Sequence, residues 1–200
     1  MRRLLALTIL SAAVACSDTT APLAVNEDLL DDGGLQWADL GRVCAPSASA
    51  VPLTAEQLAS LPGGSPSSDH VLADLTRDVT GGFGGVMVPD GAWTIYLVDP
   101  ALRDEATTEL LALGVIPQAP QVVLKGRWTF AQMVDWQQYI FVHVGFPPGM
   151  VWADVQEARN RLEFGVLDET ARAELEAELT ALGAPCYLAA IGISAPIVSR

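Results

Sequence analysis

The sequence of 200 residues is poor in the residue types that most often build catalytic and metal sites. It contains two histidines, His70 and His143, and three cysteines, Cys16, Cys44 and Cys186. Two histidines are too few for a His-rich metal site, and no GxSxG elbow or other familiar nucleophile motif accompanies them. The sequence therefore predicts no cofactor, no metal ion and no catalytic residue.

Basic residues are also scarce. The chain has 11 Lys and Arg residues against 24 Asp and Glu residues, which gives a net charge of −13 at pH 7. A surface of this charge repels phosphate backbones and anionic lipid head groups. We therefore expect no nucleic-acid partner.

The apolar run near the start of the chain is too short to cross a membrane. It covers residues 4–14, follows two arginines and ends in small residues, whereas a spanning helix needs about 20 apolar residues. This order of charge, apolar run and small residues is typical of an export signal. The sequence thus predicts a signal peptide over residues 1–15.

The residues just before Cys16 resemble the lipobox of bacterial lipoprotein signals, in which the cysteine is acylated after cleavage. Ala13 stands where that motif more often has leucine, so cleavage nearby by a conventional signal peptidase is the alternative. Because acyl chains anchor a soluble domain stably, we expect a lipid-anchored protein of the bacterial cell envelope. It would be held at the outer membrane with its domain facing the periplasm or the cell exterior.

Residues 16–68 have the composition of an acidic tether rich in Ser, Pro and Gly. The stretch NEDLLDDGG (26–34) lacks the alternating carboxylates and closing Glu of a calcium loop, which favours a solvated spacer. Within the tether, LTAEQLASLPGG (53–64) predicts one short helix, because Thr54 and Gln57 have capping-box spacing.

Two similar phrases, ELLALGVI (109–116) and ELTALGAP (178–185), begin 69 residues apart and indicate an internal repeat. Each ends a predicted helix with one apolar stripe, and the stripes match at the same offset. Their members are Leu102, Ala106, Leu110 and Leu113 in the first copy and Ala171, Leu175, Leu179 and Leu182 in the second. Asp99 and Asp168 are placed as caps of these helices, and Gly114 and Gly183 as their left-handed ends.

A predicted strand pair precedes each repeated helix and a third strand follows it. The pairs cover residues 84–98 and 150–167, with turns at 89–91 and 157–160, and the third strands cover 121–126 and 187–193. A helix over 129–141 joins the copies. The fold expected for residues 69–200 is therefore α+β. It consists of two ββαβ repeats joined by a helix, with about six strands and helices packed on one face.

The stretches VVLKGRWTFAQMVDW, GMVWADVQEARNRLEFGV and LTALGAP resemble the pro-region modules of secreted bacterial serine proteases of the streptogrisin and alpha-lytic type. The resemblance covers roughly residues 80–195 and depends on Trp152, Asp154, Asn160 and Arg161. It implies a domain without catalysis that assists the folding of a protease and blocks its active site. No protease domain follows in this sequence.

A candidate protein-binding surface includes the close basic pair Lys125 and Arg127 and the aromatic residues Trp128 and Trp152. We therefore expect a non-catalytic envelope protein that binds another protein, with a protease as one candidate partner. The alternative is a small periplasmic hydrolase whose site is built from scattered residues such as His143, Asp154 and a serine.

With Cys16 assigned to the lipid anchor, Cys44 and Cys186 form an even pair in an exported chain. Oxidising compartments favour a disulfide between two accessible thiols, so we expect Cys44 to be bonded to Cys186. The alternative is a pair of unbonded thiols.

Overall fold

The computed structural model of the protein describes residues 50–62 and 67–194. Its helices are α1 (Ala55–Ala59), α2 (Ser68–Thr76), α3 (Arg103–Ala112), α4 (Phe130–His143) and α5 (Glu169–Ala181), and its short 3-10 turns are η3 (Pro89–Gly91), η4 (Pro100–Leu102) and η5 (Glu157–Arg159). Its strands are β1 (Phe83–Met87), β2 (Thr94–Leu97), β3 (Val122–Lys125), β4 (Met150–Gln156), β5 (Arg161–Val166) and β6 (Ala189–Ile193). The predicted signal peptide, Cys16 and Cys44 lie outside the described residues.

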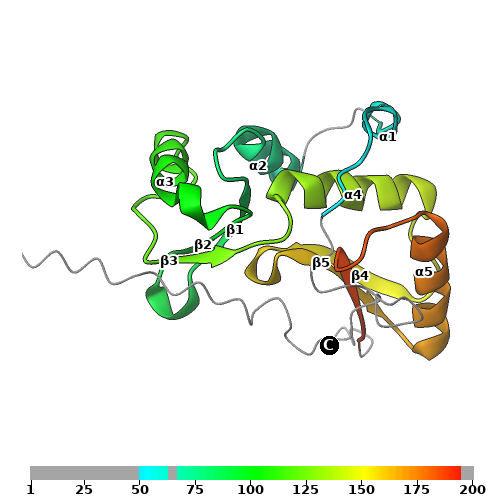
Figure 1. Cartoon of the computed structure of the whole chain (residues 1–200). Coiled ribbons are helices and arrows are strands. Elements are labelled where there is room, and N and C mark those ends of the chain that lie inside the picture. The colour runs from blue at the N-terminus through cyan, green and yellow to red at the C-terminus, as the bar shows by residue number, and fades with distance from the viewer. Residues whose placement is uncertain (1–49, 63–66, 195–200) are drawn as a thin grey trace, which may run out of the picture.

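Two three-stranded sheets with the same topology make up the framework. In the first, β1 pairs antiparallel with β2, which pairs parallel with β3. In the second, β4, β5 and β6 repeat that arrangement. The predicted α+β fold of two ββαβ units is confirmed, with the six strands divided between two sheets (Figure 1).

Local capping fixes most helix ends where the sequence places them. The Asp168 side chain accepts a hydrogen bond from the Ala171 N–H at 2.9 Å, and Thr129 caps α4 within a complete capping box. Gly114 and Gly183 both have positive φ after their helices, as predicted. Asp99 differs from the prediction, because it caps the turn η4 and α3 begins only at Arg103.

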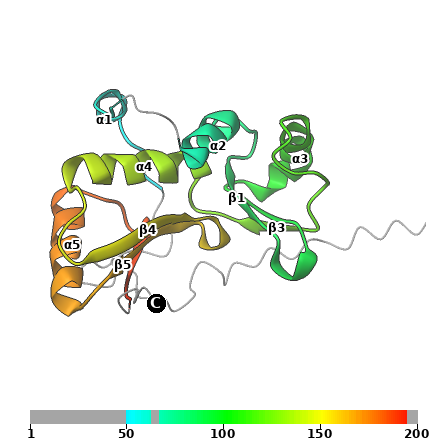
Figure 2. The same cartoon turned by 180° about the vertical axis from the view of Figure 1, so that it is seen from behind.

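Helix α4 contacts strands of both sheets: it runs along the second sheet, and its N-terminal end reaches β1 of the first, where the Phe130 and Phe83 ring centroids are 6.3 Å apart (Figure 1). Its apolar side chains Phe130, Met133, Val134 and Ile140 are buried in the common core. Viewed from behind, α3 and α5 lie at opposite ends of the molecule (Figure 2). The buried centre of each repeated stripe is as predicted, but Leu102 and Leu113 at the ends of the first stripe are exposed.

The segment before the first sheet packs against α4. The Trp136 indole N–H donates to the Val51 carbonyl oxygen at 2.9 Å, and the Gln138 amide donates to the Pro62 carbonyl oxygen at 3.0 Å. The predicted short helix is α1, and its capping box is present. Helix α2 was not predicted. Within residues 50–62 and 67–194, no helix has the length and apolar character needed to span a membrane.

Candidate protein-binding surface

Asn160 joins the second ββαβ unit to the first. Its side-chain oxygen accepts hydrogen bonds from the N–H groups of Arg127 (2.7 Å) and Trp128 (2.8 Å). Its side-chain nitrogen donates to the carbonyl oxygens of Gly84 (2.9 Å) and Trp128 (2.8 Å). These four bonds use the full capacity of the amide, and the residue is buried. Asn160 therefore has a structural role at the seam between the units.

Two further contacts hold the turn of the second hairpin against the first sheet. The Tyr96 hydroxyl donates to the Ala158 carbonyl oxygen at 3.1 Å. A Cβ atom built on Gly84 would lie 2.6 Å from the Asn160 side-chain nitrogen, so glycine is required for this approach. Because the turn is packed in this way, the buried residues Asn160 and Gly84 are not available to a partner.

Trp128 is not part of a binding surface, and this prediction was wrong. Its side chain is fully buried, and its indole N–H donates to the Tyr187 carbonyl oxygen at 3.1 Å. The residue directly before it, Arg127, is half-buried, with its guanidinium 4.2 Å from the Tyr187 ring centroid. Trp128 is buried because the hydrogen bonds from the N–H groups of residues 127 and 128 to Asn160 hold both residues at the contact between the two units.

Arg161 and Asp154, which contribute to the pro-region resemblance, lie among other charged groups on the second hairpin. Arg161 is buried, and its guanidinium is 2.8 Å from a Glu163 carboxylate oxygen that also accepts from Arg159 at 2.9 Å. Asp154 is opposite Glu163 in the β4–β5 ladder. Burial, together with the charges of Asp69 and Glu163, raises the pKa of Asp154.

Trp152 is the aromatic residue of the predicted surface that reaches solvent. Its side chain is 36% exposed and lies over Gly165, its partner on the neighbouring strand. The indole N–H donates to the Ser194 hydroxyl at 2.9 Å. On the next strand Gly192 pairs with Gly165, and a Cβ atom built there would meet no atom within 4 Å. The hydrogen-bonded Trp152 indole thus packs on Gly165, and the space above the neighbouring Gly192 is open.

Lys125, the remaining member of the predicted surface, lies on the other sheet. It is the last residue of β3, it is exposed, and it forms no ion pair with a described residue. The four predicted residues are therefore divided among a sheet edge, the seam, the core and the second sheet. They do not make one continuous surface.

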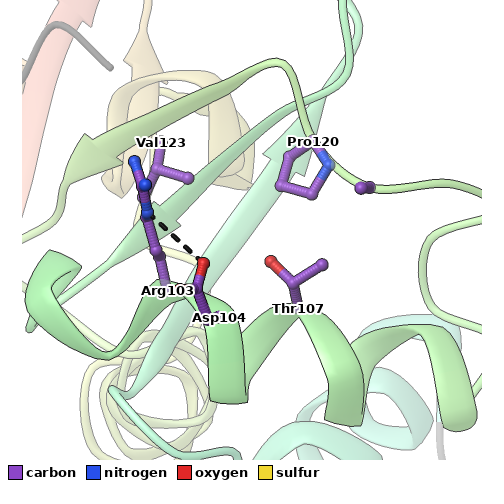
Figure 3. A pocket seen from close by; sticks show the side chains of 6 residues that line it. Arg103, Asp104, Thr107, Pro120 and Val123 are labelled. Atoms are coloured by element: carbon purple, nitrogen blue, oxygen red, sulfur yellow. Dashed lines mark ion pairs between the residues drawn. The ribbon is translucent and has the colours of Figure 1, made fainter. Parts of the chain in front are cut away.

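Sequence reasoning missed a groove between α3 and β3. It has a volume of about 250 Å³ and is lined by Arg103, Asp104, Thr107, Ala119, Pro120 and Val123 (Figure 3). The guanidinium of Arg103 is 3.4 Å from the Asp104 carboxylate at the rim. No motif marks this groove, because its wall combines one face of α3 with Val123 of β3 and with Ala119 and Pro120 of the irregular segment that precedes β3.

The residues of the hydrolase alternative are not assembled into a site. His143 at the end of α4 is exposed, its ring stacks 4.0 Å from the Tyr139 ring, and its Nδ1 is 2.8 Å from the Tyr139 carbonyl oxygen. In the part of the chain that the structure describes, no hydrogen bond or ion pair joins His143 to Asp154 or to a serine. The same part contains no cluster of three or more potential metal ligands.

Comparison with protein-family models, with curated proteins and with solved structures finds no match for this chain.

Proposed function

We propose that this chain is a non-catalytic, lipid-anchored bacterial envelope protein whose α+β domain binds another protein through the surface around Trp152. The observation that carries the proposal is the exposed indole fixed over Gly165 and bonded to Ser194. Tryptophan is among the residues that most often dominate binding energy at protein interfaces. A side chain that is already fixed loses little entropy when a partner covers it.

The surroundings of Trp152 support an apolar contact. Leu167, the residue directly after β5, is 45% exposed, and Gly192 is exposed on the neighbouring strand. A partner could therefore cover indole, leucine and glycine backbone together and remove a continuous apolar area from water. The proposed partner is a secreted serine protease of the streptogrisin or alpha-lytic type, as the pro-region resemblance implies.

The binding test uses the soluble form of the protein made by Cys16→Ser. Calorimetric titration against an active-site-blocked protease of this type should show saturable binding, and Trp152→Ala should weaken it by at least about tenfold. Phe146→Ala is the matched control, because Phe146 is a 60% exposed aromatic residue in the loop between α4 and β4. Equal losses in the two variants would contradict the assignment of the surface, and absence of binding would remove the protease as the partner.

The proposed anchor is tested separately. Mass spectrometry of the mature N-terminus should find an acylated Cys16 as the first residue, since the residues before it have the order of a lipoprotein signal. An unmodified Cys16, or a mature chain that starts elsewhere, would disprove the anchor without affecting the binding surface.

A further inference from the structure

Strand β3 presents an unpaired backbone edge. The Gly126 N–H donates to the Leu97 carbonyl oxygen at 2.8 Å and the Val122 N–H to the Trp93 carbonyl oxygen at 3.3 Å, so these groups face β2. In a parallel pair the bonding alternates along the strand. The N–H and carbonyl groups of Val123 and Lys125 therefore point outward. No strand within the described ranges pairs with this edge.

The groove between α3 and β3 lies directly beside this edge. Val123 is buried at its floor, and Pro120 adds an apolar wall opposite Thr107 on α3 (Figure 3). The volume of about 250 Å³ is enough for one medium or large apolar side chain. An extended segment bound along the edge would have every second side chain directed toward this groove.

Lys125 supplies a charge on the same face. It is two residues from Val123, so alternation along the strand directs both side chains to one side of the sheet. Each of the other basic residues in the described ranges has a carboxylate or an aromatic ring as partner. Lys125 thus offers an exposed cation that no described residue pairs with, on a chain whose net charge is −13.

We propose that the outer edge of β3 and the adjacent groove bind an extended segment of another protein, which adds to the first sheet as a fourth strand. The segment carries an apolar residue for the groove and, two positions away, a carboxylate residue for Lys125. A second copy of this chain is a poor occupant, because two molecules of net charge −13 repel each other. This site lies on the first sheet and does not require the Trp152 surface to bind anything.

The probe is a blocked, threonine-rich peptide of about ten residues with one leucine and, two positions away, one glutamate. Two versions of the peptide are made, one with the leucine before the glutamate and one with the leucine after it, because an added strand can run in either direction. Titration of the isotope-labelled Cys16→Ser protein, followed by NMR, should give saturable shifts confined to residues 103–107 and 119–126. Replacing the peptide glutamate with lysine should weaken binding by at least about tenfold, and Lys125→Glu should reverse that preference.

Backbone methylation tests the mode of binding. N-methyl groups on the peptide amides that face β3 should abolish binding, whereas methyl groups on the alternate amides should leave it within about twofold. Ala119→Phe should fill the groove and weaken binding, and Ala112→Phe on the exposed side of α3 is the matched control. Absence of saturable shifts for both peptides, shifts at another surface, or a dimer that Ala119→Phe dissociates would overturn the proposal.

Discussion

Asn160 combines a left-handed backbone conformation with four side-chain hydrogen bonds at the seam between the units. Its φ of 50° lies in the left-handed region, which asparagine tolerates better than most residues. Its amide then supplies two acceptor and two donor positions to backbone groups of the other unit. Sequence reasoning can place asparagine in a turn, but the four partners come from residues 32 to 76 positions away.

Asn160→Ala should destabilise the fold by at least about 3 kcal/mol, because it leaves the N–H groups of Arg127 and Trp128 without their acceptor. Asp90→Ala measures separately the cost of placing alanine at a positive φ, without the loss of side-chain hydrogen bonds. Asp90 has the same φ of 50° but is exposed, with no side-chain hydrogen bond to a described residue, so its loss should be about 1–2 kcal/mol. Urea unfolding measures both values, and equal losses would contradict the proposed role of the amide.

Glu157, in the same turn, predicts a dependence of stability on pH. Burial, together with the charges of Asp69 and Asp154, raises the pKa of Glu157 above its ordinary value of 4.5. The folded state therefore holds the proton more tightly than the unfolded state. Stability from this group consequently falls as pH rises from about 4.5 through the raised pKa.

Glu157→Gln should be more stable than the parent protein at about pH 7 and equally stable at about pH 4, by thermal unfolding at both values. Glu109→Gln is expected to be less stable than the parent protein at about pH 7, the opposite of Glu157→Gln. Hydrogen bonds from the Thr80 hydroxyl and N–H, both 2.7 Å, lower the pKa of Glu109, so its charged form is favoured by folding. A Glu157→Gln variant that is less stable than the parent at pH 7 would show that its charge stabilises the turn.

At the scale of elements, prediction succeeds where the deciding interactions are local. Asp168 and Thr129 bond to groups three residues away, and the strand turns are marked by Pro89 to Gly91 and by Asn160. Helix α2 was not predicted because its larger apolar side chains are exposed and smaller side chains are buried. The residues it buries are Ala73 and Thr76, whereas Val71 and Leu75 are exposed. Its position depends on packing against α4, which no local pattern reveals.

The candidate surfaces were harder to predict for the same reason. Of the residues predicted for the binding surface, Lys125 and Trp152 reach solvent, whereas Trp128 has the same sequence character as Trp152 and is buried. The two tryptophans differ in burial because Tyr187 of the second unit contacts residues 127 and 128. Sequence periodicity carries no information about that contact.

The packing of β1 on the second hairpin can be tested with two strand glycines. Gly84→Ala would place a methyl group 2.6 Å from the Asn160 side-chain nitrogen and 2.7 Å from the Trp128 carbonyl oxygen, so we expect a loss of about 1–3 kcal/mol. Gly192→Ala has open space around the new methyl group and should change stability by less than about 0.5 kcal/mol. Chemical denaturation of both variants makes the comparison, and a neutral Gly84→Ala would mean that the seam is looser than described.

At the scale of the whole molecule, the predicted disulfide would link the N-terminal segment to the last strand. Cys186 lies in the described structure just before β6 and is half-buried, whereas Cys44 lies outside the described residues. A bond between them closes a loop for which chain entropy predicts roughly 4–5 kcal/mol of stabilisation. Cys44→Ser and Cys186→Ser should therefore lose similar stability, and the double variant should lose no more than either. Two thiols alkylated in the unreduced, exported protein would disprove the bond.

In the proposed function, a protein partner covers Trp152 while the chain is held in the envelope. Site-specific photocrosslinking tests it most directly, with a photoreactive phenylalanine analogue in place of Trp152 and, as control, in place of the exposed Leu111 on α3. We expect one discrete crosslinked protein from position 152 in intact cells and none from position 111. The same products from both positions, or no crosslinked protein from position 152, would contradict it.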